Sequence, residues 1–234
     1  MPATTIHLQA TAPIAERVLL PGDPGRALQL AQSLLREPRM CNHARGLWGY
    51  TGAAPDGEPL TIQSTGMGGP SAAIVVEELI ALGARRLIRV SSCGALDPSL
   101  ELSDLVLARE AIAADGASRA LGAGERVAAS PVLSAAIERS TPELAAAGVV
   151  VSTDLFYDTD RARITRWAAE GALAVEMEAA TILRTAELHG LGAACLLVVS
   201  DRLSSARKRA PIDAAALDPA VQRMGRVALE ALAT

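Results

Sequence analysis

Hydrophobic positions along the chain fall into short apolar runs separated by stretches with helical spacing. Five runs rich in Val, Ile, Leu and Ala are typical of buried strands, namely residues 17–20, 60–64, 86–90, 171–178 and 194–200. Apolar residues recur at helical spacing in three segments that follow such runs, residues 26–35, 72–83 and 179–190. Strands that alternate with helices predict an α/β fold with a mostly parallel, buried sheet.

The segments between these elements predict one domain over residues 1–234, because the chain contains no internal repeat, low-complexity tract or long linker. Residues 52–59 have the Gly and Pro content of a hairpin turn. Residues 117–131 carry the weakest pattern, and we expect a surface loop there.

Composition narrows the function classes. The 234 residues are 50% hydrophobic with a net charge of −4, which indicates a large core and excludes a generally basic, nucleic-acid-binding surface. The three cysteines are scattered, as expected in a reducing cytosol. The N-terminus has no signal-peptide pattern, and no apolar run approaches the ~20 residues of a membrane span. We therefore expect a soluble, cytoplasmic protein.

Glycines and polar residues cluster where the predicted strands end. Five such segments are "PGDPGR", "TGMGGPS", "SSCGA", "EME" and "SD". Ligands of open α/β sheets bind at the carboxyl ends of the strands. The sequence therefore predicts one pocket at this edge, although any single segment also fits an ordinary turn.

Two arginines at this edge suit an anion. Arg26 follows Gly22 and opens a helix, whose free N–H groups favour negative charge. Arg89 interrupts an apolar strand and needs either a carboxylate partner or an anionic ligand. The hydroxyls of Ser91 and Ser92 follow it. Together these groups are typical of a phosphate cradle.

Three carboxylates also occur at the predicted edge. Glu176 and Glu178 are two residues apart and would share one face of a strand, with Met177 opposite. If the strand ends at this point, all three side chains can reach the edge. Either glutamate can bind the vicinal hydroxyls of a sugar, or interact with the N-terminus of the next helix. Asp201 ends the most apolar strand, where burial would suit a general acid, although a turn residue is the alternative.

Other motifs are weak or absent. Phe156 and Tyr157 are adjacent in a chain with 2% aromatics, which indicates either a stacking surface for a flat base or ordinary core. The chain lacks a P-loop, a complete dinucleotide fingerprint and a G-x-S-x-G elbow. The three histidines lack metal-ligand spacing.

The motifs together resemble a known family. "LLPGDPGRA", "HARGLWGYTG", "TGMGGPSAAIVVEEL", "RVSSCGA", "TDLFY", "VEMEAA" and "VVSD" occur in order over almost the whole chain. In these segments the chain is similar to the hexameric branch of the nucleoside phosphorylase family, and within it to bacterial purine nucleoside phosphorylases. The resemblance implies a three-layer αβα fold around a mixed, mostly parallel, twisted sheet.

The resemblance also implies roles for individual residues. The residues that would hold phosphate are Gly22, Arg26, Arg89 and Ser92, with Arg45 reaching the site of a neighbouring subunit. The residues that would contact the nucleoside are Met67, Phe156, Glu176, Met177, Glu178 and Ser200, with His7 entering the neighbour's site. Glu178 would bind the ribose 2′- and 3′-hydroxyls, and Asp201 would protonate N7 of the leaving purine.

The implied reaction is the reversible phosphorolysis of purine (deoxy)ribonucleosides to the free base and (deoxy)ribose 1-phosphate. Phosphate is a co-substrate, and neither a cofactor nor a metal is implied. The implied assembly is a homohexamer, a trimer of dimers with shared sites, without nucleic-acid or membrane partners.

The chain departs from the family at two places. Ser91 stands where the family usually has glycine, so the backbone there is expected to be stiffer. In purine enzymes a second arginine often assists the aspartate, but the spacing does not decide between Arg207, Arg209 and neither.

Three alternative functions remain open. A uridine phosphorylase fits several motifs, yet its Gln-x-Arg insertion is missing from "FYDTDRARITRW". A nucleosidase of the same superfamily would not need Arg26 and Arg89 as a phosphate pair. A non-catalytic nucleoside-binding protein would keep Glu178 and Phe156 without needing Asp201.

Overall fold

The computed structural model describes residues 5–158, 160–203 and 209–233. Within them, the helices and the single 3₁₀ turn are α1 (Pro24–Leu34), η1 (Ala44–Gly46), α2 (Gly69–Ala81), α3 (Gly116–Ala120), α4 (Pro131–Arg139), α5 (Arg161–Ala169), α6 (Ala179–Leu188) and α7 (Ala214–Leu232). The strands are β1 (Arg17–Leu20), β2 (Arg36–Asn42), β3 (Gly49–Ala53), β4 (Pro59–Gln63), β5 (Arg86–Ala95), β6 (Leu105–Ala114), β7 (Arg126–Ala128), β8 (Ala146–Thr153), β9 (Ala172–Glu176), β10 (Gly192–Leu203) and β11 (Arg209–Pro211).

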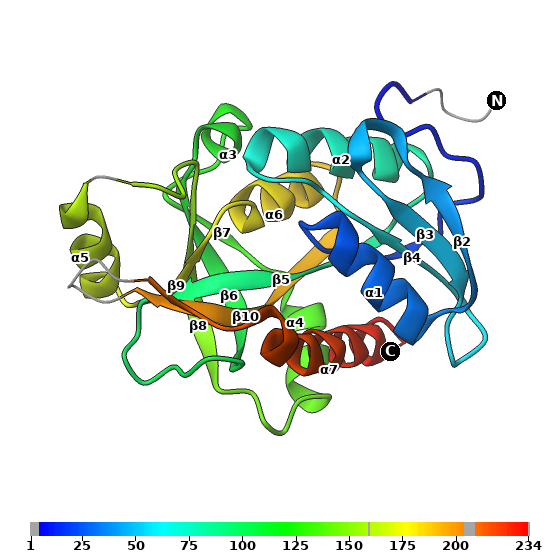
Figure 1. Cartoon of the computed structure of the whole chain (residues 1–234). Coiled ribbons are helices and arrows are strands. Elements are labelled where there is room, and N and C mark those ends of the chain that lie inside the picture. The colour runs from blue at the N-terminus through cyan, green and yellow to red at the C-terminus, as the bar shows by residue number, and fades with distance from the viewer. Residues whose placement is uncertain (1–4, 159, 204–208, 234) are drawn as a thin grey trace.

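Helices cover both faces of a mixed sheet, as predicted (Figure 1). One buried apolar cluster joins the sheet to α2 and α6, and a second joins its other face to α1, α4 and α7. The two longest ladders, β5–β10 and β6–β8, are parallel. The three-layer α/β prediction is therefore confirmed.

The strand order contains a closure that the sequence pattern did not predict. Strands β5, β10, β6, β8 and β9 pair in turn, and β9 pairs antiparallel with β5 to close the ring. The open part of the sheet continues from β5 through β1, β4, β3 and β2. The closure brings the end of β9 beside the end of β5, so the polar residues of both strands reach one place.

Most predicted elements occur with shifted ends. The predicted strand at 17–20 has the bounds of β1, whereas the strand predicted at 86–90 continues to Ala95. The helix predicted from Arg26 begins at Pro24, because Asp23 caps it. The hairpin turn predicted at 52–59 joins β3 to β4.

The predicted surface loop at 117–131 is wrong. This segment contains most of α3, all of β7 and the first residue of α4. Local caps explain the difference, since Asp115 caps α3 and Ser130 caps α4 through side-chain oxygens.

Among the residues that the structure describes, every helix is too short or too polar to cross a bilayer. The three cysteines are buried and free.

Candidate active site

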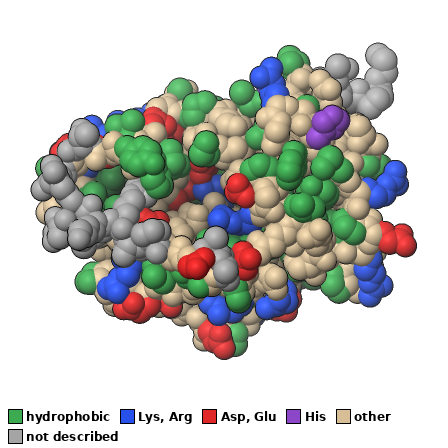
Figure 2. All heavy atoms as spheres, viewed as in Figure 1, with side chains coloured by type: hydrophobic (Ala, Val, Ile, Leu, Met, Phe, Trp, Pro, Cys, Tyr) green, Lys and Arg blue, Asp and Glu red, His purple; other side chains and the backbone are tan. Residues whose placement is uncertain are grey.

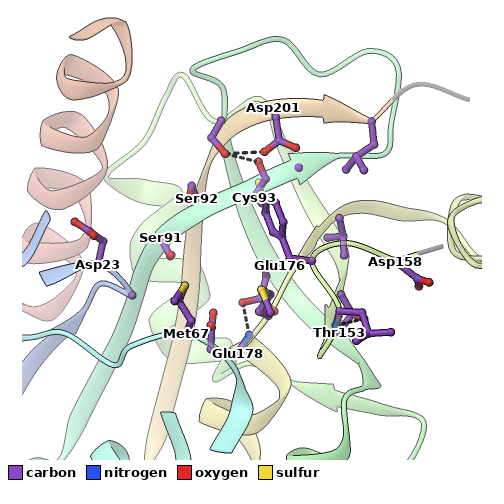
Figure 3. Close-up of a pocket in the computed structure, with 18 of the residues that line it drawn as sticks. Asp23, Met67, Ser91, Ser92, Cys93, Thr153, Asp158, Glu176, Glu178 and Asp201 are labelled. Atoms are coloured by element: carbon purple, nitrogen blue, oxygen red, sulfur yellow. Dashed lines mark hydrogen bonds between the residues drawn. The ribbon is translucent and has the colours of Figure 1, made fainter. Parts of the chain in front are cut away.

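One large cavity, of about 1010 Å³, opens where the predicted polar segments meet. Its lining includes residues from every one of the five segments, which confirms the predicted pocket at the strand ends. Figure 2 shows a hollow with acidic and basic side chains inside it. Figure 3 shows Ser91 and Ser92 on β5, Glu176 and Glu178 at the end of β9, and Asp201 on β10 around a common space.

The N-terminus of α1 forms one end of the cavity. The Asp23 carboxylate accepts a hydrogen bond from the Arg26 backbone N–H at 2.7 Å and fixes this helix start. A Cβ on Gly22 would lie 3.3 Å from the Gly66 carbonyl oxygen, so glycine allows the two turns to approach each other. Arg26 Nη1 lies 3.5 Å from Ser92 Oγ.

Two arginines lie close enough at this end to affect each other's pKa. Burial lowers the pKa of Arg26, the Asp23 carboxylate opposes this, and the nearby Arg89 guanidinium lowers the pKa further. Each guanidinium disfavours the charged form of the other, and an anion bound between them would stabilise both charged forms. The α1 N-terminus contributes in the same direction.

Arg89 is buried and holds two carboxylates. Its Nε donates to Glu176 Oε2 at 2.9 Å, and its Nη2 donates to Glu178 Oε2. Burial opposes the charged form, but Glu178 and Glu176 more than offset it and raise the pKa of Arg89. Its Nη1 is buried and has no hydrogen-bond partner among the described residues. Arg89 therefore has the carboxylate partners of the first alternative. It lies outside the cavity lining, and a contact with an anionic ligand through Nη1 stays a prediction.

The Glu176 carboxylate is fully used within the protein. Besides Arg89, it accepts from the backbone N–H groups of Glu178 at 2.8 Å and Ala179 at 2.9 Å, and from the Ser152 hydroxyl. The two backbone donors belong to the start of α6, so Glu176 serves as a helix N-terminal acid. The geometry supports a positioning role for this carboxylate. Glu176 also lines the cavity, and its predicted contact with the nucleoside stays a prediction.

Glu178 lies beyond the end of β9, so the two glutamates do not share a strand face. Glu176, Met177 and Glu178 all line the cavity, as expected for a strand that ends there. Its Oε1 accepts the Gly68 N–H at 2.5 Å. Burial raises the pKa of the Glu178 carboxyl, with Arg89 acting in the opposite direction. The carboxylate lines the cavity and keeps acceptor capacity for a ligand.

A β-bulge places Ser200 and Asp201. Val199 pairs with Cys93 and Asp201 pairs with Gly94, so Ser200 is the extra residue on β10. The Ser200 hydroxyl donates to the Cys93 carbonyl at 3.2 Å and lies 3.0 Å from Asp201 Oδ1. Asp201 is buried at the cavity wall.

Apolar groups complete the wall. Phe156 is 45% exposed and lines the cavity, whereas Tyr157 meets its ring edge-on and stays outside the lining. Met67 and Met177 line the same cavity from the turn after β4 and the end of β9. A flat ligand beside Phe156 would therefore lie within reach of Asp201 and Glu178.

His7 and Arg45 differ from the other predicted residues. His7 is not part of the lining and contacts Glu78 of α2, with Nδ1 2.8 Å from Oε1. Arg45 is exposed at the edge of its own chain's cavity, in the left-handed region with φ 58°. Their predicted placement in a neighbour's site stays a prediction.

The model of the phosphorylase superfamily matches residues 16–233. The chain belongs to the phosphorylase superfamily. Proteins named "Purine nucleoside phosphorylase DeoD-type" are similar over most of their length. The protein of Caldanaerobacter subterraneus subsp. tengcongensis is 38% identical over 209 residues, 85% of this chain and 88% of the relative. The protein of Geobacillus kaustophilus is 38% identical over 208 residues, 85% of this chain and 86% of the relative.

For this member of the phosphorylase superfamily, sequence reasoning missed part of the cavity. The missed lining residues include Leu96, Thr153, Ile164, Trp167 and Leu203. The apolar spacing of α5 was the available signal, but nothing local places that helix beside β9. Arg207 lies outside the described residues, and only the backbone of Arg209 is described, in β11.

Proposed function

We propose that the chain is a purine nucleoside phosphorylase, which transfers the pentosyl group of a purine nucleoside to inorganic phosphate. One observation carries this proposal: Arg26, Glu178 and Asp201 line one cavity, and Arg89, which is buried outside the lining, pairs with Glu178. Membership of the superfamily and the names of the similar proteins support the same reaction.

Phosphate would bind between the start of α1 and the end of β5. Arg26, Ser92 and the unused Nη1 of Arg89 are the donors that we assign to it, with Gly22 allowing close approach. Arg45 at the cavity edge is a further candidate, from this subunit or its neighbour. Bidentate donors suit phosphate, and a buried donor without a partner favours an acceptor ligand.

The ribose would lie between phosphate and base. The Glu178 carboxylate accepts its 2′- and 3′-hydroxyls, and Met67 and Met177 contact its carbon atoms. Arg89 and Gly68 fix the orientation of Glu178 before substrate arrives. Such preorganisation lowers the cost of binding.

The base would lie against Phe156 with N7 toward Asp201, and Ser200 would position that carboxyl. As the glycosidic bond breaks, positive charge grows on the sugar and negative charge on the base. Phosphate stabilises the first charge and attacks C1′, while a proton from Asp201 neutralises the second. We expect no cofactor besides the phosphate co-substrate.

We further propose a homohexamer built from dimers, in which His7 reaches the neighbour's ribose site. Ile6 is 74% exposed, and its backbone N–H, like that of His7, donates to Glu78 of α2. Ile74 of the same helix is 39% exposed. Hydrophobic side chains also gather on the surface beside the hollow (Figure 2). Exposed apolar patches of this kind are typical of interfaces.

A mixing experiment tests the shared site. Hexamers that combine His7→Ala and Asp201→Asn subunits contain some sites with both wild-type residues. Mixed hexamers more active than either variant alone support the shared site, whereas an active monomer in light scattering contradicts it.

The reaction is tested by base release from inosine and from uridine, each with and without phosphate. Hypoxanthine released only in the presence of phosphate is the expected result. Uracil release would favour the uridine enzyme, release without phosphate a nucleosidase, and tight binding without release a binding protein.

A further inference from the structure

The cavity continues beyond the proposed base position into an apolar region. Leu96 and Trp167 belong to one buried apolar cluster, and Ile164, Val175 and Leu203 pack against it. All of these residues also line the cavity. They come from four separate places, the residue after β5, helix α5, strand β9 and the end of β10, so the region is a built part of the fold.

Strand β5 orders the parts of the cavity along one line. Ser92 lies at the phosphate end, Gly94 lies under Asp201, and Leu96 lies in the apolar region. These residues are two apart, so they fall on the same side of an extended chain. At about 3.3 Å per residue, Ser92 and Leu96 are separated by roughly 13 Å along the strand. The apolar region is therefore at the far end of the cavity from phosphate.

The apolar region begins directly beside the proposed acid. A Cβ on Gly94 would lie 2.4 Å from Leu203 Cδ1 and 3.0 Å from Asp201 Oδ2, so both side chains lie over this glycine. In a purine, the C6 substituent lies on the same edge of the base as N7, on the side of N7 that is farther from the ribose. A base with N7 at Asp201 thus directs its C6 substituent toward Leu203 and Leu96.

The lining of this region is mostly apolar, so it favours an apolar ligand group over a polar one. Segment 155–168 adds two polar side chains to the lining, Asp158 and Thr165. The Asp158 carboxylate already accepts the Asp160 N–H at 2.8 Å and pairs with Arg163 at 3.3 Å. The cavity volume of about 1010 Å³ lies at the upper end for small-molecule sites. A nucleoside with phosphate suits the middle of the size range for such sites, so a cavity at its upper end has room for a further substituent.

We propose that Leu96, Ile164, Trp167, Val175 and Leu203 form an apolar subsite for purine nucleosides that carry a bulky apolar group at C6. The inference rests on the proposed phosphorylase function and names a substrate class for that site. An apolar group that leaves water for this subsite gains affinity in proportion to the buried area.

The test compares inosine with 6-benzylthiopurine riboside in the wild type and in two variants of α5. Ala168 lines the cavity, whereas Ala169 is outside the lining, so Ala168→Phe fills the subsite and Ala169→Phe is the matched control. We expect Ala168→Phe to lower kcat/KM for the benzylthio compound by about 10–200-fold, with inosine changed less than about threefold. Ala169→Phe should change neither substrate by more than about threefold.

The outcomes separate the subsite from the proposed function. Wild-type turnover of inosine without turnover of the benzylthio compound would overturn the subsite and leave the phosphorylase intact. An equal loss of both substrates in Ala168→Phe would also overturn it. Failure of phosphate-dependent inosine cleavage in the wild type would instead reject the proposed function itself.

Discussion

Replacement of Glu176 by Gln tests whether Glu176 positions its neighbours while Glu178 binds the ribose. The carboxylate accepts hydrogen bonds at both oxygens, from Arg89 and Glu178 at Oε2, from Ser152 at Oε1, and from Ala179 at both. A glutamine side chain must place its NH₂ group against one of these sets of donors. Glu176→Gln therefore removes a buried ion pair and leaves buried donors unsatisfied.

The magnitude follows from these contacts. Removing one partner of a buried ion pair costs about 3–5 kcal/mol, and Arg89 keeps Glu178 as a second partner, so we expect the lower end. For a chain of this size, about 3 kcal/mol lowers Tm by roughly 6–12 °C. The assay is thermal unfolding, with nucleoside KM measured below the transition.

Two controls make the result specific. Glu187→Gln, whose side chain is 61% exposed, removes an exposed pair with Arg184 and should change stability by less than about 0.5 kcal/mol. Glu178→Gln should raise nucleoside KM more than Glu176→Gln does, because only Glu178 is assigned to the ribose. A Glu176→Gln variant with wild-type Tm and strongly raised nucleoside KM would refute the positioning role.

Three further predictions concern the reaction. Asp201→Asn should lower kcat for inosine by about 10²–10⁴-fold. The kcat for 7-methylguanosine, whose base leaves without needing a proton at N7, should fall much less. Equal losses of kcat for the two substrates would contradict the acid role. Nucleoside KM should rise as pH falls through the pKa of Glu178, because the protonated carboxyl no longer accepts both hydroxyls. Burial raises this pKa, so the rise should begin at a higher pH than for an ordinary glutamate. A flat KM profile in that range would argue against Glu178 as the ribose acceptor. Gly94→Ala should displace Leu203 or Asp201, because the new Cβ would lie 2.4 Å and 3.0 Å from their side-chain atoms. This displacement should lower kcat by up to about 10²-fold. Unchanged kinetics would show that the Asp201 position is not held by this contact.

The parts of the site that could be predicted from sequence all follow from short sequence patterns around single strands. Each of the five polar segments directly follows an apolar strand pattern, and parallel strands bring such ends to one edge of a sheet. The meeting of Arg26, Ser92 and Asp201 in one cavity could therefore be predicted without knowledge of the strand order. Strands 17–20 and 194–200 were recognisable because buried strands are almost continuously apolar.

The parts that were missed depend on tertiary pairing. The antiparallel contact of β9 with β5 rests on two residue pairs, Gly94 with Val175 and Ala95 with Ala174, which have no distinct sequence signal. This contact ends β9 at Glu176 and places α5 beside the cavity. Consequently, neither the different surroundings of Glu176 and Glu178 nor the apolar region around Trp167 followed from spacing.

Local caps were the signal that sequence reasoning overlooked at 117–131. Asp115 accepts the Ser118 N–H at 2.7 Å and starts a helix of five residues, too short to show helical periodicity. Ser130 followed by Pro131 is likewise a helix-start pair. Attention to caps in addition to periodicity would have replaced the expected loop with these elements.

The central claim is that the Arg26–Arg89 end of the cavity supplies phosphate as the nucleophile. The most direct measurement is the sugar product formed from inosine in the presence of phosphate. The account predicts ribose 1-phosphate in equal amount to hypoxanthine, with Arg26→Ala raising the phosphate KM. Free ribose as the product, at a rate independent of phosphate, would contradict it.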